Sequence, residues 1–168
     1  MNLETFNALS ADAAIDALSQ CCTSERWQQQ LTAARPFDDI DALNARSENI
    51  WAELDEADYL QAFDGHPRIG DVNSLKAKYA NTHNLASSEQ SSVNQAADDV
   101  IQQLADGNTA YEEKNGFIFI VCATGKSAAQ MLEILNARLP NSRQQEIQNA
   151  AEEQRKITRI RIDKLFDL

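Results

Sequence analysis

Residues 147–168 have the sequence IQNAAEEQRKITRIRIDKLFDL, and this stretch gives the clearest indication of the fold. At the 100° rotation per residue of an α-helix, the apolar side chains fall on one stripe, namely Ile147, Ala150, Ala151, Ile157, Leu165 and Leu168. Arg161 falls within that stripe, whereas Arg155 and Arg159 project to the other side, where solvated charge is expected. The pattern therefore predicts a long amphipathic helix with one cation on its apolar face.

An arginine on a buried face needs a carboxylate partner, because an unpaired buried charge is costly. The partner of Arg161 is expected to be either a protein carboxylate, in a structural salt bridge, or a carboxylate of a ligand. The sequence leaves both interpretations open.

The rest of the sequence also favours helices, because it contains few turn-forming residues, five Gly and three Pro, and many residues of high helix propensity. Helix starts are predicted at N-capping residues, namely Ser10, Asp38 or Asp39, Ser87 (with Gln90) and Ser127 (with Gln130). Helix ends are predicted at turn-forming residues, namely Arg35-Pro36-Phe37, Gly65 with Pro67, Asp106-Gly107-Asn108 and Pro140-Asn141. A loop is expected at residues 81–84. The chain is thus predicted to be mainly α-helical.

One segment does not follow the helical pattern. Phe117 to Ala123 is a short, continuous apolar run, and its periodicity alone predicts a buried strand.

Length, charge and cysteine content limit the classes of function. A chain of 168 residues fits one domain, expected to span residues 1–168. The net charge of −11 argues against nucleic-acid binding, which depends on Lys and Arg. The sequence has no 18-residue apolar run that could span a membrane and no secretory signal at its amino terminus. With three cysteines, an odd number, including the adjacent Cys21 and Cys22, we expect a cytoplasmic protein without disulfides.

The segment Gly65-His66-Pro67-Arg68-Ile69-Gly70-Asp71 places an ionisable ring at a predicted helix break. Pro67 favours an extended conformation of His66, and histidine has the side-chain pKa nearest neutrality, as general acid–base catalysis requires. His66 is therefore either a catalytic proton-transfer group or a cap of the preceding helix. Arg68 could contact a ligand, Asp64 or Asp71.

Glu89 and Gln90 lie in the first turn of a predicted helix that begins near Ser87. An acid in this turn favours the helix dipole, and a Gln at the third position completes a capping box. Alternatively, the same turn presents a carboxylate that can stabilise an imidazolium and an amide that can bind a polar heterocycle. The capping interpretation is the simpler one for these two residues taken alone.

Motifs for nucleotides and metals are poorly matched. Gly125-Lys126-Ser127 is similar to the end of a P-loop, but Ile120 stands where the first glycine of that motif belongs. His66 and His83 are the only histidines, and no Cys or His pair has ligand spacing. The sequence therefore predicts chemistry by side chains alone, without a metal.

Several motifs together give the sequence a resemblance, close to full length, to a known enzyme family. These are Cys21-Cys22 with Arg26-Trp27, Arg35-Pro36-Phe37, His66-Pro67-Arg68-Ile69-Gly70, Ser87-Ser88-Glu89-Gln90, Asn108 to Tyr111, Phe117 to Ser127, Lys156-Ile157-Thr158, and Arg161-Ile162 with Leu165. The chain resembles the 2-oxo-4-hydroxy-4-carboxy-5-ureidoimidazoline (OHCU) decarboxylases of urate breakdown. It departs from the usual pattern at Ala86, where relatives often have Trp.

The resemblance implies an all-α, single-domain multi-helix bundle that forms a homodimer and uses no metal or organic cofactor. It also implies a buried helical setting, rather than a strand, for Phe117 to Ala123. His66 is implied to be the catalytic acid and Glu89 its charged partner. The implied substrate-binding residues are Pro67, Ser87, Gln90, Ile120, Val121, Cys122, Ala123 and Arg161.

The activity implied by the resemblance is the cofactor-independent decarboxylation of OHCU, a small ureidoimidazoline, to (S)-allantoin. Two other interpretations of the sequence stay open. One is a non-enzymatic helical interaction module, in which His66 and Glu89 cap helices and Arg161 makes a structural salt bridge. The other is a cofactor-free hydrolase or isomerase of another ureide.

Overall fold

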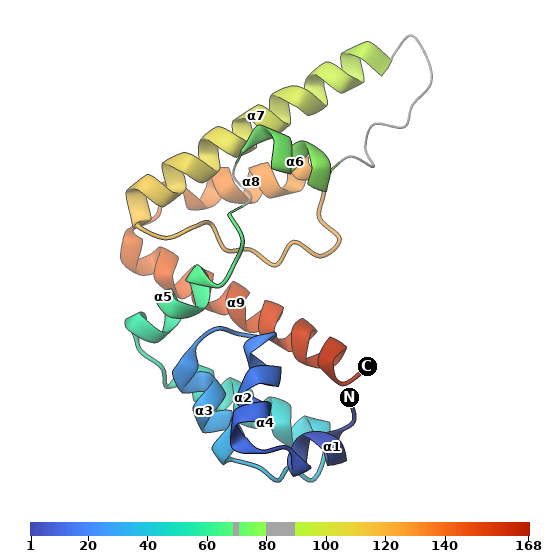
Figure 1. Cartoon of the computed structure of the whole chain (residues 1–168). Coiled ribbons are helices and arrows are strands. Elements are labelled where there is room, and N and C mark those ends of the chain that lie inside the picture. Colours follow the sequence, from blue (N-terminus) through green and yellow to red (C-terminus); the bar gives the residue numbers. More distant parts are fainter. Residues whose placement is uncertain (69–70, 80–89) are drawn as a thin grey trace. The chain divides into compact units, whose positions relative to one another are not determined.

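The computed structural model describes residues 1–68, 71–79 and 90–168, and for residues 90–96 it describes the backbone alone. This part of the chain contains nine helices and no strand (Figure 1). The helices are α1 (Leu3–Ala8), α2 (Ala11–Ser19), α3 (Glu25–Ala33), α4 (Ile40–Ala52), α5 (Glu56–Asp64), α6 (Val72–Lys78), α7 (Gln90–Asn115), α8 (Ala128–Arg138) and α9 (Arg143–Leu165). The fold class predicted from the sequence, all-α, is confirmed.

The chain is organised as two compact units. Unit 1 consists of Met1–His66, Ile120–Cys122 and Ile147–Leu168, and unit 2 consists of Pro67–Phe119 and Ala123–Glu146. The boundary between the units falls inside α9, after Glu146. The expectation of a single domain over residues 1–168 stays a prediction.

The predicted helix starts agree with the observed caps. The side chains of Ser10 and Asp39 accept hydrogen bonds from Ala13 N and Ala42 N, at 3.2 and 2.7 Å. Ser127 and Gln130 form a complete capping box, with reciprocal side-chain to backbone bonds of 2.8 and 3.2 Å. Local capping chemistry therefore determines where these helices begin.

In unit 1, α3 packs against α2, α4 and α5 (Figure 1). Two buried tryptophans keep their indole N–H groups satisfied: Trp27 donates to Ser47 Oγ at 3.1 Å and Trp51 donates to Ala151 O at 3.0 Å. The second bond joins α4 to α9, so the aromatic core also fixes the position of α9 within this unit.

In unit 2, α7 packs against both α6 and α8 (Figure 1). The polar centre of unit 2 is Glu146, which is fully buried. The Glu146 carboxylate accepts from Tyr111 Oη at 2.6 Å, Arg138 Nε at 2.7 Å and Asn141 Nδ2 at 2.9 Å. These donors offset the cost of burying the charge.

The prediction that Asp106-Gly107-Asn108 ends a helix is wrong, because α7 continues through it to Asn115. A Cβ at Gly107 would lie 2.5 Å from Leu135 Cδ2 of α8. Gly107 thus allows α7 and α8 to approach closely and does not form a turn.

The strand predicted for Phe117 to Ala123 is also absent, and the helical setting implied by the resemblance is absent too. Residues 117–123 have no regular secondary structure. The run is apolar because Phe117 and Phe119 pack edge-on against Tyr111 in unit 2, with ring centroids 5.9 and 5.2 Å apart. Apolar packing is therefore achieved here by an irregular segment.

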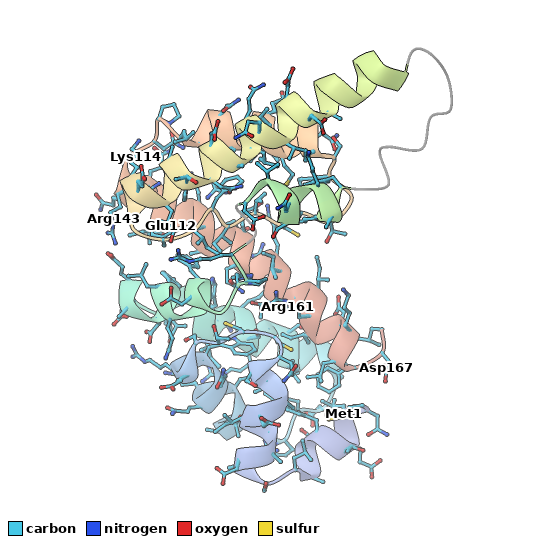
Figure 2. All side chains as sticks on the ribbon, turned by 45° about the horizontal axis from the view of Figure 1, so that its top comes forward. Met1, Glu112, Lys114, Arg143, Arg161 and Asp167 are labelled. Carbon is cyan, nitrogen blue, oxygen red and sulfur yellow. The ribbon has the colours of Figure 1, made fainter. Side chains whose placement is uncertain are left out.

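Two further differences concern the helices at the ends of the sequence. Between the helix start predicted at Ser10 and the helix end predicted at Arg35-Pro36-Phe37 the structure has two helices, α2 and α3, because the chain turns at the buried Cys21 and Cys22. The predicted stripe on α9 is correct for Ile147, Ala150 and Ala151 but not for Leu168, which is 72% exposed beyond the end of the helix. Asp167 there has a positive φ of 57°, which ends the helical path; its carboxylate pairs with the Met1 amino group at 2.8 Å (Figure 2).

Candidate active site

His66 follows α5 in unit 1 and is held there by close backbone packing. Its N–H donates to Phe63 O at 3.2 Å. The preceding Gly65 lies against Thr23, whose Oγ1 would be 2.1 Å from a Cβ at position 65. That hydroxyl donates to the Gln61 and Ala62 carbonyls at 3.0 and 3.3 Å. The absence of a side chain at Gly65 thus lets the end of α5, and with it His66, dock against the Thr23 segment.

The imidazole of His66 is half-buried and points to α9. Its Nε2 lies 2.5 Å from Oε1 of Gln154. Gln154 is 1% exposed and in turn donates from Nε2 to Oγ1 of Thr158 at 3.0 Å. The ring therefore has a buried, neutral hydrogen-bond partner that is itself held by a second side chain.

The pKa of His66 is lowered from its ordinary value of 6.5. Burial is the largest cause, and the positive charge of Arg161 acts in the same direction, whereas the hydrogen bond to Gln154 opposes both. His66 is therefore neutral at pH 7 and able to accept a proton.

Arg161 lies on α9 within unit 1 (Figure 2). Its Nη1 donates to the Cys21 carbonyl at 3.4 Å. In the described part of the chain Arg161 has no carboxylate partner, in contrast to Arg155, which pairs with Glu48 and Glu152 at 3.0 and 2.7 Å. Which of the two partners expected from the sequence Arg161 has stays a prediction.

Cys21 and Cys22 lie beside this cluster and are buried and reduced. Burial raises the pKa of Cys21 to about 12 and that of Cys22 to about 11. Both thiols are therefore protonated at neutral pH and unsuited to act as nucleophiles.

Residues 120–122 are attached to α9 by Glu153. The Cys122 N–H donates to Glu153 Oε1 at 3.3 Å, and Glu153 Oε2 pairs with Lys156 at 2.7 Å. The structure thus brings three of the four predicted backbone positions into the same unit as His66 and Arg161. The Cys122 N–H, however, is bonded to a protein side chain.

The other predicted site residues are not among the described residues of unit 1. Pro67 and Ala123 belong to unit 2, where Pro67 lines a cavity of about 90 Å³ together with Thr109 and Phe119. Ser87 and Glu89 lie outside the described residues, as do the predicted loop at residues 81–84 and the capping box of Ser87. Gln90 is the first residue of α7, and only its backbone is described.

Among the described residues of unit 2, Arg68 pairs with a glutamate and not with Asp71. It forms an ion pair with Glu112 of α7, and the Arg68 side chain is 77% exposed. Asp71 instead caps α6 by accepting from Ser74 N at 2.8 Å.

The described residues contain no group of three or more His, Cys, Asp or Glu side chains arranged to hold a metal ion. Among the helices described, none combines the length and the apolar character needed to cross a lipid bilayer.

Comparison with known proteins identifies the family. The OHCU decarboxylase family model matches residues 7–163. The chain belongs to the OHCU decarboxylase family. The resemblance inferred from the His-Pro segment, the Glu-Gln pair and the closing helix is thereby confirmed.

Individual members of the OHCU decarboxylase family give the extent of the likeness. The uric acid degradation bifunctional protein TTL of Arabidopsis thaliana is 32% identical over 90% of this chain, and the chain spans 47% of that protein, about half its length. The 2-oxo-4-hydroxy-4-carboxy-5-ureidoimidazoline decarboxylase of Halalkalicoccus jeotgali is 24% identical over 98% of this chain and 92% of that protein. A crystal structure of an OHCU decarboxylase in the presence of (S)-allantoin is 32% identical, with a TM-score of 0.72 over 91% of this chain and 99% of that one.

Gln154 is the site residue that sequence reasoning missed. It precedes Arg161 by seven residues, two turns of helix, and so lies on nearly the same face. A glutamine within the predicted apolar stripe was the signal that could have found it, together with the buried Thr158 four residues later.

Proposed function

We propose that this chain catalyses the cofactor-independent decarboxylation of OHCU to (S)-allantoin, with His66 as the general acid and base. Membership of the OHCU decarboxylase family supports the reaction and the substrate. One structural observation supports the site: His66, with its lowered pKa, and Arg161, with no carboxylate partner among the described residues, belong to one cluster in unit 1.

The reaction requires a place for the electron pair that is released when carbon dioxide leaves. A ring C=N next to the carboxylate-bearing carbon can accept this pair, so that the C–C bond breaks, a ring C=C bond forms and the imine nitrogen takes up a proton. Loss of the 4-hydroxyl proton and protonation of the neighbouring ring carbon then give the product. The substrate itself serves as the electron sink, and the protein positions it and moves protons.

The roles proposed for the described residues follow from their chemistry. His66, neutral at pH 7, accepts the hydroxyl proton and returns a proton to one face of the ring carbon, which gives a single enantiomer. Arg161 holds the substrate carboxylate by charge-assisted hydrogen bonds. Pro67 and residues 120–123 are proposed as substrate-binding residues on the family resemblance.

Three further residues are proposed on the family resemblance alone. Glu89 is the charged partner of His66, and Ser87 and Gln90 bind the polar heterocycle. No contact of the described chain bears on these three roles.

Assembly and location are proposed with the activity. The family resemblance supports a homodimer. Three free cysteines, two of them adjacent and buried, support a reducing compartment such as the cytoplasm. The family match, which spans residues 7–163, supports one functional domain.

Circular dichroism during turnover of freshly generated OHCU tests the proposed activity. The wild-type protein is expected to form (S)-allantoin faster than the spontaneous reaction and with one sign of ellipticity. The His66→Asn variant is expected to lose roughly 10²–10⁴-fold in rate if general acid–base catalysis is the role of His66. The matched control, His83→Gln, replaces the other histidine.

Two results would overturn parts of this proposal. A wild-type rate equal to the spontaneous background would refute the activity. Near-normal turnover and enantiomeric excess in folded His66→Asn would refute the role of His66 while leaving the activity in place.

A further inference from the structure

Gln154 is an unusual occupant of the buried face of α9. It is 1% exposed, and Ala150, Ala151 and Ile162 lie on the same face. Burial of a primary amide is unfavourable unless its oxygen and its nitrogen both find hydrogen-bond partners. The partners that Gln154 has are therefore informative about why an amide is placed there.

The nitrogen and the oxygen of the Gln154 amide each have a hydrogen-bond partner. Gln154 Nε2 donates to Thr158 Oγ1 at 3.0 Å. The Thr158 side chain also lies within hydrogen-bonding reach of the Cys22 thiol. The Cys22 backbone is held in turn, because its carbonyl accepts from Gln28 Nε2 at 2.8 Å. This arrangement leaves the amide oxygen of Gln154 directed at His66.

An amide oxygen only accepts hydrogen bonds. At 2.5 Å from Gln154 Oε1, His66 Nε2 must therefore carry the hydrogen. We propose that Gln154, oriented by Thr158, is a positioning residue that keeps neutral His66 as the Nε2–H tautomer, so that Nδ1 is the atom that takes up and returns the proton in catalysis.

The catalytic part of this inference rests on the proposed function, whereas the tautomer does not. The same contact suits both protonation states of the ring, because Nε2 keeps its hydrogen and its bond to Gln154 while Nδ1 gains or loses a proton. The ring then need not rotate between accepting the hydroxyl proton and delivering a proton to carbon.

A neutral partner also differs from a carboxylate in its effect on basicity. A carboxylate at this position would stabilise the imidazolium strongly and raise the pKa of His66. The amide orients the ring with a smaller effect, and burial and Arg161 still keep the pKa of His66 below its ordinary value. Gln154 therefore fixes the geometry of the ring, whereas Glu89, as proposed above, would act on the imidazolium through its charge and not through Nε2.

The reversed amide makes the opposite prediction. If Gln154 Nε2 faced the ring, His66 Nε2 would have to be the acceptor, and the hydrogen would lie on Nδ1. Nitrogen-15 NMR distinguishes the two tautomers directly, because protonated and unprotonated ring nitrogens resonate at well-separated positions and couple differently to the ring C–H protons.

The first experiment uses the full chain with ¹⁵N-labelled histidine, the His83→Gln substitution and no polyhistidine tag, so that His66 is the only labelled residue. At pH 8 we expect a single neutral form with the hydrogen on Nε2. A hydrogen on Nδ1, or a rapidly averaging mixture, would overturn the inference. This result does not depend on whether the protein decarboxylates OHCU.

The second experiment compares three variants by NMR and by turnover. Gln154→Leu removes the acceptor, and Thr158→Val removes the group that orients the amide; both are expected to give mixed tautomers and a lower kcat. For Gln154→Leu we expect a loss of roughly 10–100-fold, the size seen when the partner that orients a metal-bound histidine is removed. Gln154→Glu is expected to retain the Nε2–H tautomer and to raise the pKa of His66.

The matched control is Gln148→Leu, the same substitution on the exposed side of α9; it should leave tautomer and kcat unchanged. If Gln154→Leu and Thr158→Val lower only the melting temperature and keep the tautomer and the kcat of the folded enzyme, Gln154 has a purely structural role and the inference fails. If the wild type has the Nε2–H tautomer but no activity on OHCU, the proposed function fails and the assignment of the tautomer stands.

Discussion

A Cβ atom at Gly65 would lie 2.1 Å from Oγ1 and 2.5 Å from Cγ2 of Thr23. Thr23 cannot easily move away, because its hydroxyl bonds the last carbonyls of α5 and its β-branched side chain is stiff. We therefore predict that Gly65→Ala lowers the free energy of unfolding by about 1–3 kcal/mol through overpacking, as measured by urea denaturation.

A double-mutant cycle with Thr23→Ala isolates the contact from general effects of the substitution. In the Thr23→Ala background the two closest atoms, Oγ1 and Cγ2, are removed and only the Thr23 Cβ at 2.8 Å remains, so Gly65→Ala should cost less than it does in the wild type. Additive losses would show that Gly65 is needed for another reason.

The depressed pKa of His66 predicts a pH dependence of stability. Because the unfolded chain protonates this ring near pH 6.5 and the folded chain only at lower pH, the unfolded state binds more protons as pH falls below about 7. The free energy of unfolding should therefore fall from pH 7 towards pH 5 more steeply in the wild type than in His66→Asn. Equal slopes in urea titrations over this range would contradict the assignment.

Arg161→Gln should weaken substrate binding, because it removes the cation proposed to hold the substrate carboxylate. Loss of a hydrogen bond to a charged group costs about 1.5–3 kcal/mol, which corresponds to a KM increase of roughly 10–150-fold. Steady-state kinetics on OHCU measures this effect. Arg159→Gln, on the same helix but with surface partners Glu48 and Asp163, is the control, and a similar increase in that variant would argue against a specific role for Arg161.

Glu146→Gln should strongly lower the free energy of unfolding, because it breaks the buried ion pair of unit 2. The substitution leaves the guanidinium of Arg138, 10% exposed, without its compensating charge. Breaking a buried ion pair in this way costs about 3–5 kcal/mol, and urea denaturation would measure it. Glu133→Gln, an exposed site on α8, is expected to change the free energy of unfolding by less than about 0.5 kcal/mol; comparable losses in the two variants would refute the prediction.

Helix starts could be predicted from the sequence because they depend on chemistry within a few residues. Ser10, Asp39 and Ser127 cap helices as expected. The errors arose where a tertiary contact, and not the local sequence, determines the secondary structure. Gly107 has the character of a helix breaker in isolation, yet it provides the space that Leu135 of α8 occupies.

The candidate site was predictable in part for the same reason. His66 stands out by its residue type and its proline neighbour, and Arg161 by its place on an apolar stripe. Gln154 does not stand out, because glutamine is common in this chain and is recognised only when both its burial and its contact with His66 are known. The contact joins residues 88 positions apart in the sequence, and no local pattern encodes that pairing.

Glu153, Gln154, Thr158 and Arg161 all project from one helix, so their spacing follows the helical rise of about 1.5 Å per residue rather than the conformation of a loop. Sites built on helices keep their geometry more closely than sites built on loops. An insertion or deletion of one residue among these positions would turn the following side chains by about 100° and so place Arg161 and Gln154 on different faces of the helix. The length of α9 between residues 153 and 161 is thus under a stricter constraint than the identity of the exposed residues within it.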